Sequence, residues 1–231
     1  MITIQELSVG FSSRLVLEDI HLHVARGEWI AVVGKNGCGK TTLLRTICAL
    51  ERPRTGQVLV AGIPVHRMGA TKRARTLAVV PQRPPILPPL TALEVVLLGR
   101  FAHTGPLRPA NHHDRCVAEA CLEETGAQAL AQETLVLLLD EPAAHLDPSW
   151  AITVLAILAR RHQQGQTIVL VAHDLNGTAL YCPRFVALDR GRVVYDGPSR
   201  DFFTPNRLRD LYGTPFCLLH HPVADVPQAL P

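Results

Sequence analysis

Short apolar runs alternate along the chain with stretches that have a helical pattern. Each run has about the length of a single strand. Strands are predicted at Ile2 to Val9, Ile20 to Val24, Trp29 to Val33, Gln57 to Ala61, Leu77 to Val80, Leu135 to Asp140, Thr167 to Ala172, Phe185 to Asp189 and Arg192 to Asp196. Helices are predicted at Lys40 to Leu50 and at Ser149 to His162. This order indicates an α/β sheet with antiparallel strands near the N-terminus.

A proline-rich stretch from Pro81 to Pro89 interrupts the strand pattern. Proline removes a backbone donor and breaks regular pairing, and the residues that follow, to about Glu133, are mainly helical in pattern. The sequence therefore predicts one domain over residues 1–231, built in three parts. These are an α/β core (1–82 and 134–214), an inserted helical subdomain (83–133) and a proline-rich, poorly patterned tail (215–231).

A glycine-rich loop joins the strand Trp29 to Val33 to the helix that follows. It matches the phosphate-binding P-loop pattern in the required strand–loop–helix setting, with the residues Gly34, Lys35, Asn36, Gly37, Cys38, Gly39, Lys40, Thr41 and Thr42. Glycines let successive backbone N–H groups converge on a phosphate, and the helix N-terminus adds positive potential. Lys40 is expected to neutralise the β- and γ-phosphate oxygens, and Thr41 to ligate Mg²⁺. The alternative is a chance glycine-rich turn.

Two carboxylates, Asp140 and Glu141, end the apolar strand that starts at Leu135. The carboxyl ends of strands face the ligand crevice of an open α/β sheet, so both side chains are expected near the P-loop. Asp140 is expected to hold Mg²⁺, and Glu141 to polarise an attacking water. The alternative is a solvated strand end.

Further motifs give the chain a family resemblance. Val80-Pro81-Gln82 follows one strand, Pro142 and residues 144–147 follow the carboxylates, and His173-Asp174-Leu175-Asn176 follows the strand 167–172. Together with the P-loop, these residues resemble the ATPases of the ATP-binding-cassette (ABC) family over about residues 2–214. The resemblance implies a single ABC ATP-binding domain with a P-loop NTPase sheet and a catalytic α/β core. It also implies ATP and Mg²⁺ as ligands.

The resemblance implies roles for individual residues. Gln82 is expected to sense Mg²⁺ and the attacking water, and His173 to act as the switch histidine at the γ-phosphate. Asp147 is expected in the loop that crosses a dimer interface. Phe11 is expected to stack on adenine, with packing in the core as the alternative. The implied catalytic residues are thus Glu141, His173 and Gln82.

The cargo class is also suggested by resemblance alone. The segments 91–100, 173–176, 181–182, 191–194 and 211–213 are similar to those of ATPases from iron-siderophore, ferric citrate, haem and cobalamin importers. In that family the partners are permease membrane subunits and a second ATPase subunit, and the ATPase lies peripherally on the inner face of the cell membrane. These residues do not touch the cargo, so the cargo inference is associational.

Composition and sequence pattern limit the binding partners and the cellular location that we expect for the chain. The net charge is only +3, which is too near neutral for a protein that holds nucleic acid by bulk charge. The longest apolar runs fall well short of the about 20 residues that cross a bilayer, and the N-terminus has no leader-peptide pattern. We therefore expect no nucleic-acid partner, no direct membrane span and a cytoplasmic location.

The chain departs from the family at one motif. An ABC cassette carries a Leu-Ser-Gly-Gly-Gln signature at the start of a helix upstream of the carboxylate strand, and this sequence has none. The nearest candidate, Gly126-Ala127-Gln128, lies too close to Asp140 to leave room for that helix. Residues 129–131 read Ala-Leu-Ala, which resembles the family on either side of the signature. We hypothesise an internal deletion that shortens the helical subdomain.

The missing signature changes the expected activity. In the family, each ATP is clamped between the P-loop of one subunit and the signature of the other, so a homodimer of this chain lacks half of each clamp. Loss of preorganised donors at a developing phosphoryl charge costs on the order of a few kcal/mol. The first hypothesis is an ATP-binding and hydrolysing importer subunit. The alternative is a subunit that binds ATP without turning it over.

One weaker cluster includes several metal-ligand types. Residues 111–116 read Asn-His-His-Asp-Arg-Cys, and Cys121 follows. The spacing matches no closed four-ligand zinc site, so a helix cap with exposed histidines is the preferred interpretation.

Overall fold

The computed structural model describes residues 1–82, 88–105, 108–124, 128–144, 146–222, 224 and 226–230. Its largest element is a six-stranded sheet in the order β10-β9-β3-β8-β7-β6. The strands are β10 (Arg192–Pro198), β9 (Arg184–Asp189), β3 (Trp29–Val33), β8 (Thr167–Val171), β7 (Val136–Asp140) and β6 (Leu77–Val80). All neighbouring pairs are parallel except β10 with β9. The carboxyl ends of five strands therefore lie at one edge.

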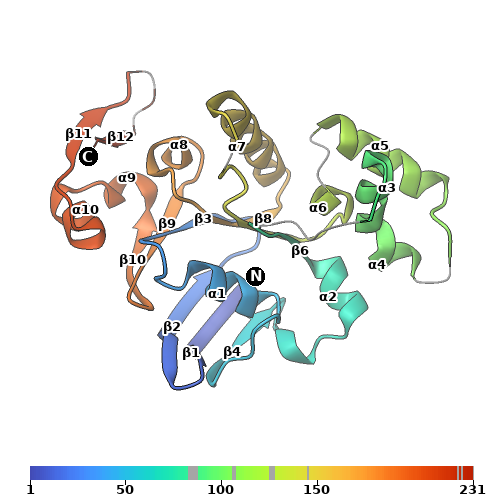
Figure 1. Cartoon of the computed structure of the whole chain (residues 1–231), viewed down its shortest axis with the longest axis horizontal. Coiled ribbons are helices and arrows are strands. Elements are labelled where there is room, and N and C mark those ends of the chain that lie inside the picture. The colour runs from blue at the N-terminus through green and yellow to red at the C-terminus, as the bar shows by residue number, and fades with distance from the viewer. Residues whose placement is uncertain are drawn as a thin grey trace.

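A second, antiparallel sheet is built mainly from the N-terminal residues. Its order is β2-β1-β4-β5, with β1 (Ile2–Phe11), β2 (Arg14–Val24), β4 (Thr55–Val60) and β5 (Ile63–Pro64). Helix α1 (Lys40–Ile47) lies between the two sheets, and α7 (Pro148–Gln163) and α8 (Leu175–Ala179) cover the opposite face of the larger one (Figure 1). The α/β fold and its antiparallel N-terminal strands are thus confirmed.

Strand β3 shows why the core has two layers. All of its residues are buried, and alternate side chains point to opposite faces of the sheet. Ile30 and Val32 pack into the cluster with Leu43 and Leu44 of α1, while Ala31 and neighbouring residues pack into the cluster under α7. A strand covered on both faces reads as a continuous apolar run, which is why the sequence predicted it well.

Apart from β6, the described residues between β5 and β7 include several short helices. These are η1 (Val65–Arg67), α2 (Ala70–Thr76), α3 (Ala92–Leu97), η2 (Leu98–Arg100), α4 (Phe101–Thr104), α5 (His112–Glu124) and α6 (Gln128–Ala131). Arg100 is only 3% exposed and joins them. Its Nε donates to Asp114 Oδ1 at 2.9 Å, and its Nη1 donates to the Ala131 carbonyl at 3.0 Å and to Glu133. One cation therefore ties η2, α5 and the end of α6 together.

The start of α5 is held by a reciprocal cap. The Asn111 side chain accepts from the Asp114 N–H at 2.9 Å, and the Asp114 carboxylate accepts from the Asn111 N–H at 3.1 Å. His112 and His113 are exposed. Within the described residues, no group of three or more potential ligands could hold a metal ion. The helix-cap interpretation of this segment is confirmed.

One predicted strand boundary is wrong, and one stretch with no strand pattern does contain strands. Strand β2 begins at Arg14 rather than Ile20, because register shifts along its pairing with β1, one of them beside Asp19 at φ 50°, break the period-two alternation. The tail is also better ordered than its composition suggests. After α9 (Ser199–Phe202) and α10 (Pro205–Tyr212), β11 (Cys217–His220) and β12 (Pro227–Leu230) form an antiparallel hairpin.

The hairpin and the short helices α3 to α6 lie at opposite ends of the molecule, with the six-stranded sheet between them (Figure 1). Among the helices that the structure describes, none combines the length and apolar character needed to cross a membrane.

Candidate functional site

Strand β3 leads directly into the glycine-rich loop, and the backbone there accepts only glycine at two positions. Gly34 has φ 143°, and a Cβ on it would lie 2.2 Å from the Leu188 carbonyl oxygen. Gly39 has φ 110°, and its Cβ would lie 2.6 Å from Leu17 Cδ2. Left-handed backbone and close approach together require a residue with no side chain. The loop is therefore pressed against β9 and β2, and α1 begins at its end.

Lys40 holds its charge inside the loop. The side chain is only 5% exposed, and Nζ donates to the carbonyls of Gly34 at 2.8 Å and Lys35 at 3.0 Å. These neutral acceptors satisfy two of the three ammonium donors. An anion at the loop can replace them with charge-assisted hydrogen bonds, which are stronger.

Asp140 and Thr41 bring two hard oxygen donors together beside Lys40. Thr41 Oγ1 donates to Asp140 Oδ1 at 3.3 Å, and Asp140 is 5% exposed. Burial raises the pKa of the Asp140 carboxyl, and the Thr41 hydrogen bond opposes the rise. A hydroxyl and a carboxylate at one point fit the oxygen ligands that Mg²⁺ prefers. These two residues can therefore hold the metal, with the Gln82 amide oxygen as a third donor.

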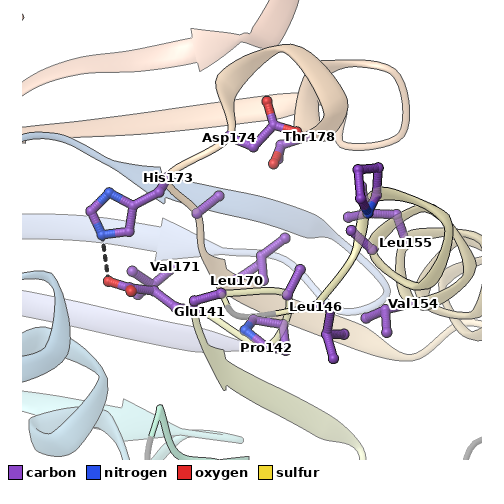
Figure 2. A pocket seen from close by; sticks show the side chains of 15 residues that line it. Glu141, Pro142, Leu146, Val154, Leu155, Leu170, Val171, His173, Asp174 and Thr178 are labelled. Atoms are coloured by element: carbon purple, nitrogen blue, oxygen red, sulfur yellow. Dashed lines mark hydrogen bonds and ion pairs between the residues drawn. The ribbon is translucent and has the colours of Figure 1, made fainter.

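Glu141 lies at the centre of a second cluster. Its Oε2 accepts from Gln82 Nε2 at 2.7 Å, and its Oε1 lies 2.5 Å from His173 Nε2, as the dashed line in Figure 2 marks. The three residues follow β6, β7 and β8, which are neighbouring parallel strands. Glu141 itself has φ 54°, and its N–H donates to the Val171 carbonyl at 3.1 Å. Strand order thus brings together side chains that are far apart in sequence.

A cavity of about 390 Å³ joins the loop to this cluster. Most of its wall consists of residues that the sequence predicted for the site. It is lined by Val16, Asn36, Gly37, Gly39, Lys40, Thr41, Thr42, Gln82, Glu141 and His173. Val16 of β2 also lines this cavity but was not predicted for the site, because it fell outside the predicted strands and no local motif marks it. The cavity wall carries a cation, the Thr41 hydroxyl and a carboxylate, an arrangement suited to phosphoryl groups.

A neighbouring cavity of about 320 Å³ shares Glu141 and His173 but is mainly apolar (Figure 2). Leu155 and Val154 of α7, Leu146 and Leu170 contribute to its wall. Glu141 and His173 therefore lie between a polar cavity and an apolar one.

Other predicted residues lie outside the polar cavity. Phe11 ends β1 and is 50% exposed, so its stacking on adenine stays a prediction. Lys35 and Cys38 line a third cavity behind the loop, and burial raises the pKa of the Cys38 thiol. The Asp147 carboxylate caps α7, where Oδ1 accepts from the N–H groups of Ser149 and Trp150 at 3.0 Å. Gly126 and Ala127, the nearest signature candidates, lie outside the described residues.

Sequence comparison identifies a family. A family profile described as "ABC transporter" matches residues 17–135. The iron(3+)-hydroxamate import ATP-binding protein FhuC of Bacillus subtilis is 33% identical and covers 90% of this chain and 86% of its own length. The hemin import ATP-binding protein HmuV of Nocardia farcinica is 37% identical, with 95% and 83% covered. The achromobactin transport ATP-binding protein CbrD of Dickeya dadantii is 29% identical, with 100% and 94% covered.

Solved structures agree on the fold. An inward-facing ABC transporter assigned to the metal-chelate type has a TM-score of 0.83 at 23% identity, with 100% of this chain and 96% of that chain covered. A dimeric ATP-binding cassette in a post-hydrolysis state, bound to ADP and phosphate, has a TM-score of 0.77 at 24% identity, with 87% and 99% covered.

Proposed function

This chain belongs to the ABC transporter family, and we propose that it is the ATP-binding subunit of an importer for iron-siderophore or haem cargo. The observation that carries the proposal is the polar cavity, in which the P-loop, Asp140, Glu141 and His173 converge. The cargo class is supported by the names of the relatives, which import an iron hydroxamate, hemin and achromobactin. Their similarity extends over most of this chain.

The geometry supports distinct tasks for the site residues. When ATP enters, Lys40 exchanges the carbonyls of Gly34 and Lys35 for phosphate oxygens. Thr41 and Asp140 would hold Mg²⁺, which would neutralise phosphate charge. Glu141 exchanges its bond to Gln82 for the attacking water, and His173 contacts the γ-phosphate. Binding of ATP at the P-loop is thereby coupled to release of the Glu141 carboxylate from Gln82.

We place the chain on the inner face of the cell membrane, bound to permease subunits and to a second ATP-binding subunit. The relatives named above are import or transport ATP-binding proteins, and the post-hydrolysis cassette is a dimer. A single chain presents one P-loop and one catalytic carboxylate. The partner subunit is expected to supply the donors that close over the γ-phosphate.

We further infer that a segment bearing the signature is absent from the helical subdomain. The similarity to CbrD extends over 253 positions, whereas this chain has 231 residues, so at least 253 − 231 = 22 of those positions have no counterpart here. No Leu-Ser-Gly-Gly-Gln occurs in the sequence. The short α6, which ends shortly before β7, supports a loss in this connection.

The expected consequence is ATP binding without turnover by the chain alone. In a homodimer both sites lack the second half of the clamp, and the lost donors cost on the order of a few kcal/mol of transition-state stabilisation. Paired with an intact homologue, the chain contributes one P-loop and Glu141 to a site that the partner's signature completes. One of the two sites then hydrolyses ATP.

Co-purification tests this function. We expect the affinity-tagged B. subtilis hydroxamate permease, co-expressed with its own ATP-binding protein, to retain this chain in Mg-ATP. A Lys40→Ala variant should be lost from the complex, while Lys72→Ala, on the remote helix α2, should be retained. If neither this chain nor the Lys72 variant is retained, although the permease holds its own subunit, the importer assignment is wrong.

A further inference from the structure

The C-terminal elements, α10 and the hairpin of β11 and β12, lie against two parts of the candidate site. These are the P-loop and the helix that follows His173. Burial raises the pKa of the Tyr212 hydroxyl at the end of α10, and a backbone hydrogen bond from Gly34, the first residue of the P-loop, opposes the rise. Gly213 lies so close to the same loop that a Cβ on it would be 3.3 Å from Lys35 Nζ. The hairpin that follows packs on α8, the helix after His173.

A single side chain attaches the hairpin to α8. Asn176 Nδ2 donates to the Ala229 carbonyl at 2.9 Å, and Asn176 Oδ1 accepts from the Ala229 N–H at 2.8 Å. The amide thus pairs with β12 as a neighbouring strand does. Ala229 is 5% exposed, so neither of its backbone groups has ready access to water as a substitute.

The pairing leaves the hairpin's own ladder intact. Ala229 faces Leu218 of β11, and both of its backbone groups point to Asn176 instead. That arrangement is the non-hydrogen-bonded pair of an antiparallel ladder. Loss of the Ala229 N–H therefore removes a bond to α8 and none to β11.

Asn176 is rigidly connected to His173. Asp174 caps α8, accepting from the Gly177 N–H at 3.0 Å, and a Cβ on Gly177 would lie 2.3 Å from Asp174 Oδ2. The turn between β8 and α8 is thus closely packed. A shift of α8 is transmitted to His173, whose Nε2 lies 2.5 Å from Glu141.

We propose that Asn176 is a positioning residue, which holds the C-terminal hairpin on α8 and thereby fixes the reach of His173 toward Glu141. This inference rests on the proposed function only in giving His173 a role at the γ-phosphate. An isolated helix of about one and a half turns is not stable in water, so α8 depends on tertiary contacts such as this one. Tyr212, at the end of α10, contacts the P-loop, and Ala229 of the hairpin contacts Asn176 in the helix after His173. The C-terminal residues thus reach two loops of the site.

Two substitutions test the contact from opposite sides. Asn176→Ala removes the amide, and Ala229→Pro removes only the N–H that donates to it. Gln228→Ala is the matched control, because that side chain lies on the same hairpin and its amide donates to the carbonyl of the neighbouring Pro227. We expect the first two variants to lose about tenfold of the hydrogen-exchange protection of α8, and the control to keep it.

The decisive readout is the NMR resonance of the His173 ring, assigned by its absence in His173→Asn. We expect this resonance to move in Asn176→Ala and Ala229→Pro and to stay in place in Gln228→Ala. The double variant should differ little from either single one, because both break the same pair. Affinity for a fluorescent ATP analogue should change by less than about twofold, which a merely unfolded variant cannot match.

If exchange shows the hairpin released while the His173 resonance stays in place, the proposal is overturned. Unchanged protection of α8 in both variants would overturn it as well. If the unmodified chain does not bind the ATP analogue, the proposed function is contradicted instead. The comparison of His173 resonances between the variants still tests the positioning role of Asn176.

Discussion

Two regions of the molecule are held together in different ways. One, the nucleotide edge, is the edge of the large sheet that carries the P-loop. The other is the helical region, formed by α3 to α6. At the sheet edge, β3, β7 and β8 are buried along their whole length and pair over long sequence separations. In the helical region, short elements meet around the guanidinium of Arg100. Apolar side chains are buried in both regions, with Val96, Ala118 and Leu130 among them in the helical region, and there a buried ion cluster adds to the apolar contacts. Under the proposed loss of a segment from the helical part, we expect the strands of the site to stay in place, because they pair with one another.

The largest effect is expected at the ion cluster. Arg100→Ala leaves the buried Asp114 carboxylate, which is 3% exposed, without its guanidinium. Removing one partner of a buried pair costs about 3–5 kcal/mol, so we expect the free energy of unfolding to fall by that amount in urea titration. Arg209→Ala, an exposed arginine of α10, should change it by less than about 0.5 kcal/mol. Equal effects of the two substitutions would show that the cluster does not hold this region.

The next effect belongs to the nucleotide edge. Lys40→Ala removes the ammonium at the P-loop, and a lost hydrogen bond to a charged group costs about 1.5–3 kcal/mol. We therefore expect affinity for Mg-ATP, measured by isothermal titration calorimetry, to fall by about 10- to 100-fold. Lys72→Ala is the control with the same change in net charge. Full affinity in the Lys40 variant would mean that the cavity of 390 Å³ is not the nucleotide site.

A smaller effect is expected at the start of α7. Asp147 caps this helix through two backbone N–H groups, and loss of an N-cap side chain costs about 1 kcal/mol. Asp147→Ala should lower the free energy of unfolding by that amount, whereas Asp147→Asn, which can still accept both bonds, should restore most of it. If alanine and asparagine behave alike, the residue has no capping role and its importance lies in a dimer contact alone.

The smallest effect is a pH dependence confined to the helical region. Burial on its own raises the pKa of the Asp114 carboxyl, but the hydrogen bonds from Arg100 and Asn111 outweigh it, so the pKa is lowered. A lowered pKa stabilises the fold above the unfolded value of about 3.9, and the contribution is lost as the pH falls through the folded pKa. The loss of stability in acid should therefore be less steep in Asp114→Asn than in the unmodified chain. Parallel curves would contradict this assignment.

The strands of the sheet edge could be predicted from the sequence, whereas other parts of the fold could not. Strand β6 runs from Leu77 to Val80 as predicted, and the convergence of Gln82, Glu141 and His173 follows from parallel strands that end at one edge. Buried apolar runs and glycine spacing are strong local signals. They are the features that specify this part of the fold.

The tail hairpin and the contact of Asn176 could not be predicted in this way. Strands β11 and β12 are largely half-buried or exposed, and they contain or adjoin prolines, so neither the alternation nor the composition indicates a sheet. Two long-range hydrogen bonds between Asn176 and Ala229 join β12 to α8. Such a contact is fixed by tertiary packing and leaves no local pattern in the sequence.

The most direct test is steady-state phosphate release by the purified chain in Mg-ATP, beside Lys40→Ala and Glu141→Gln and with ATP binding measured on the same samples. We expect the unmodified chain to bind ATP and to release no more phosphate than either variant, because its helical region supplies no signature to a second subunit. Phosphate release that both substitutions abolish would contradict this, since it would mean that two copies of this chain form a complete hydrolysis site.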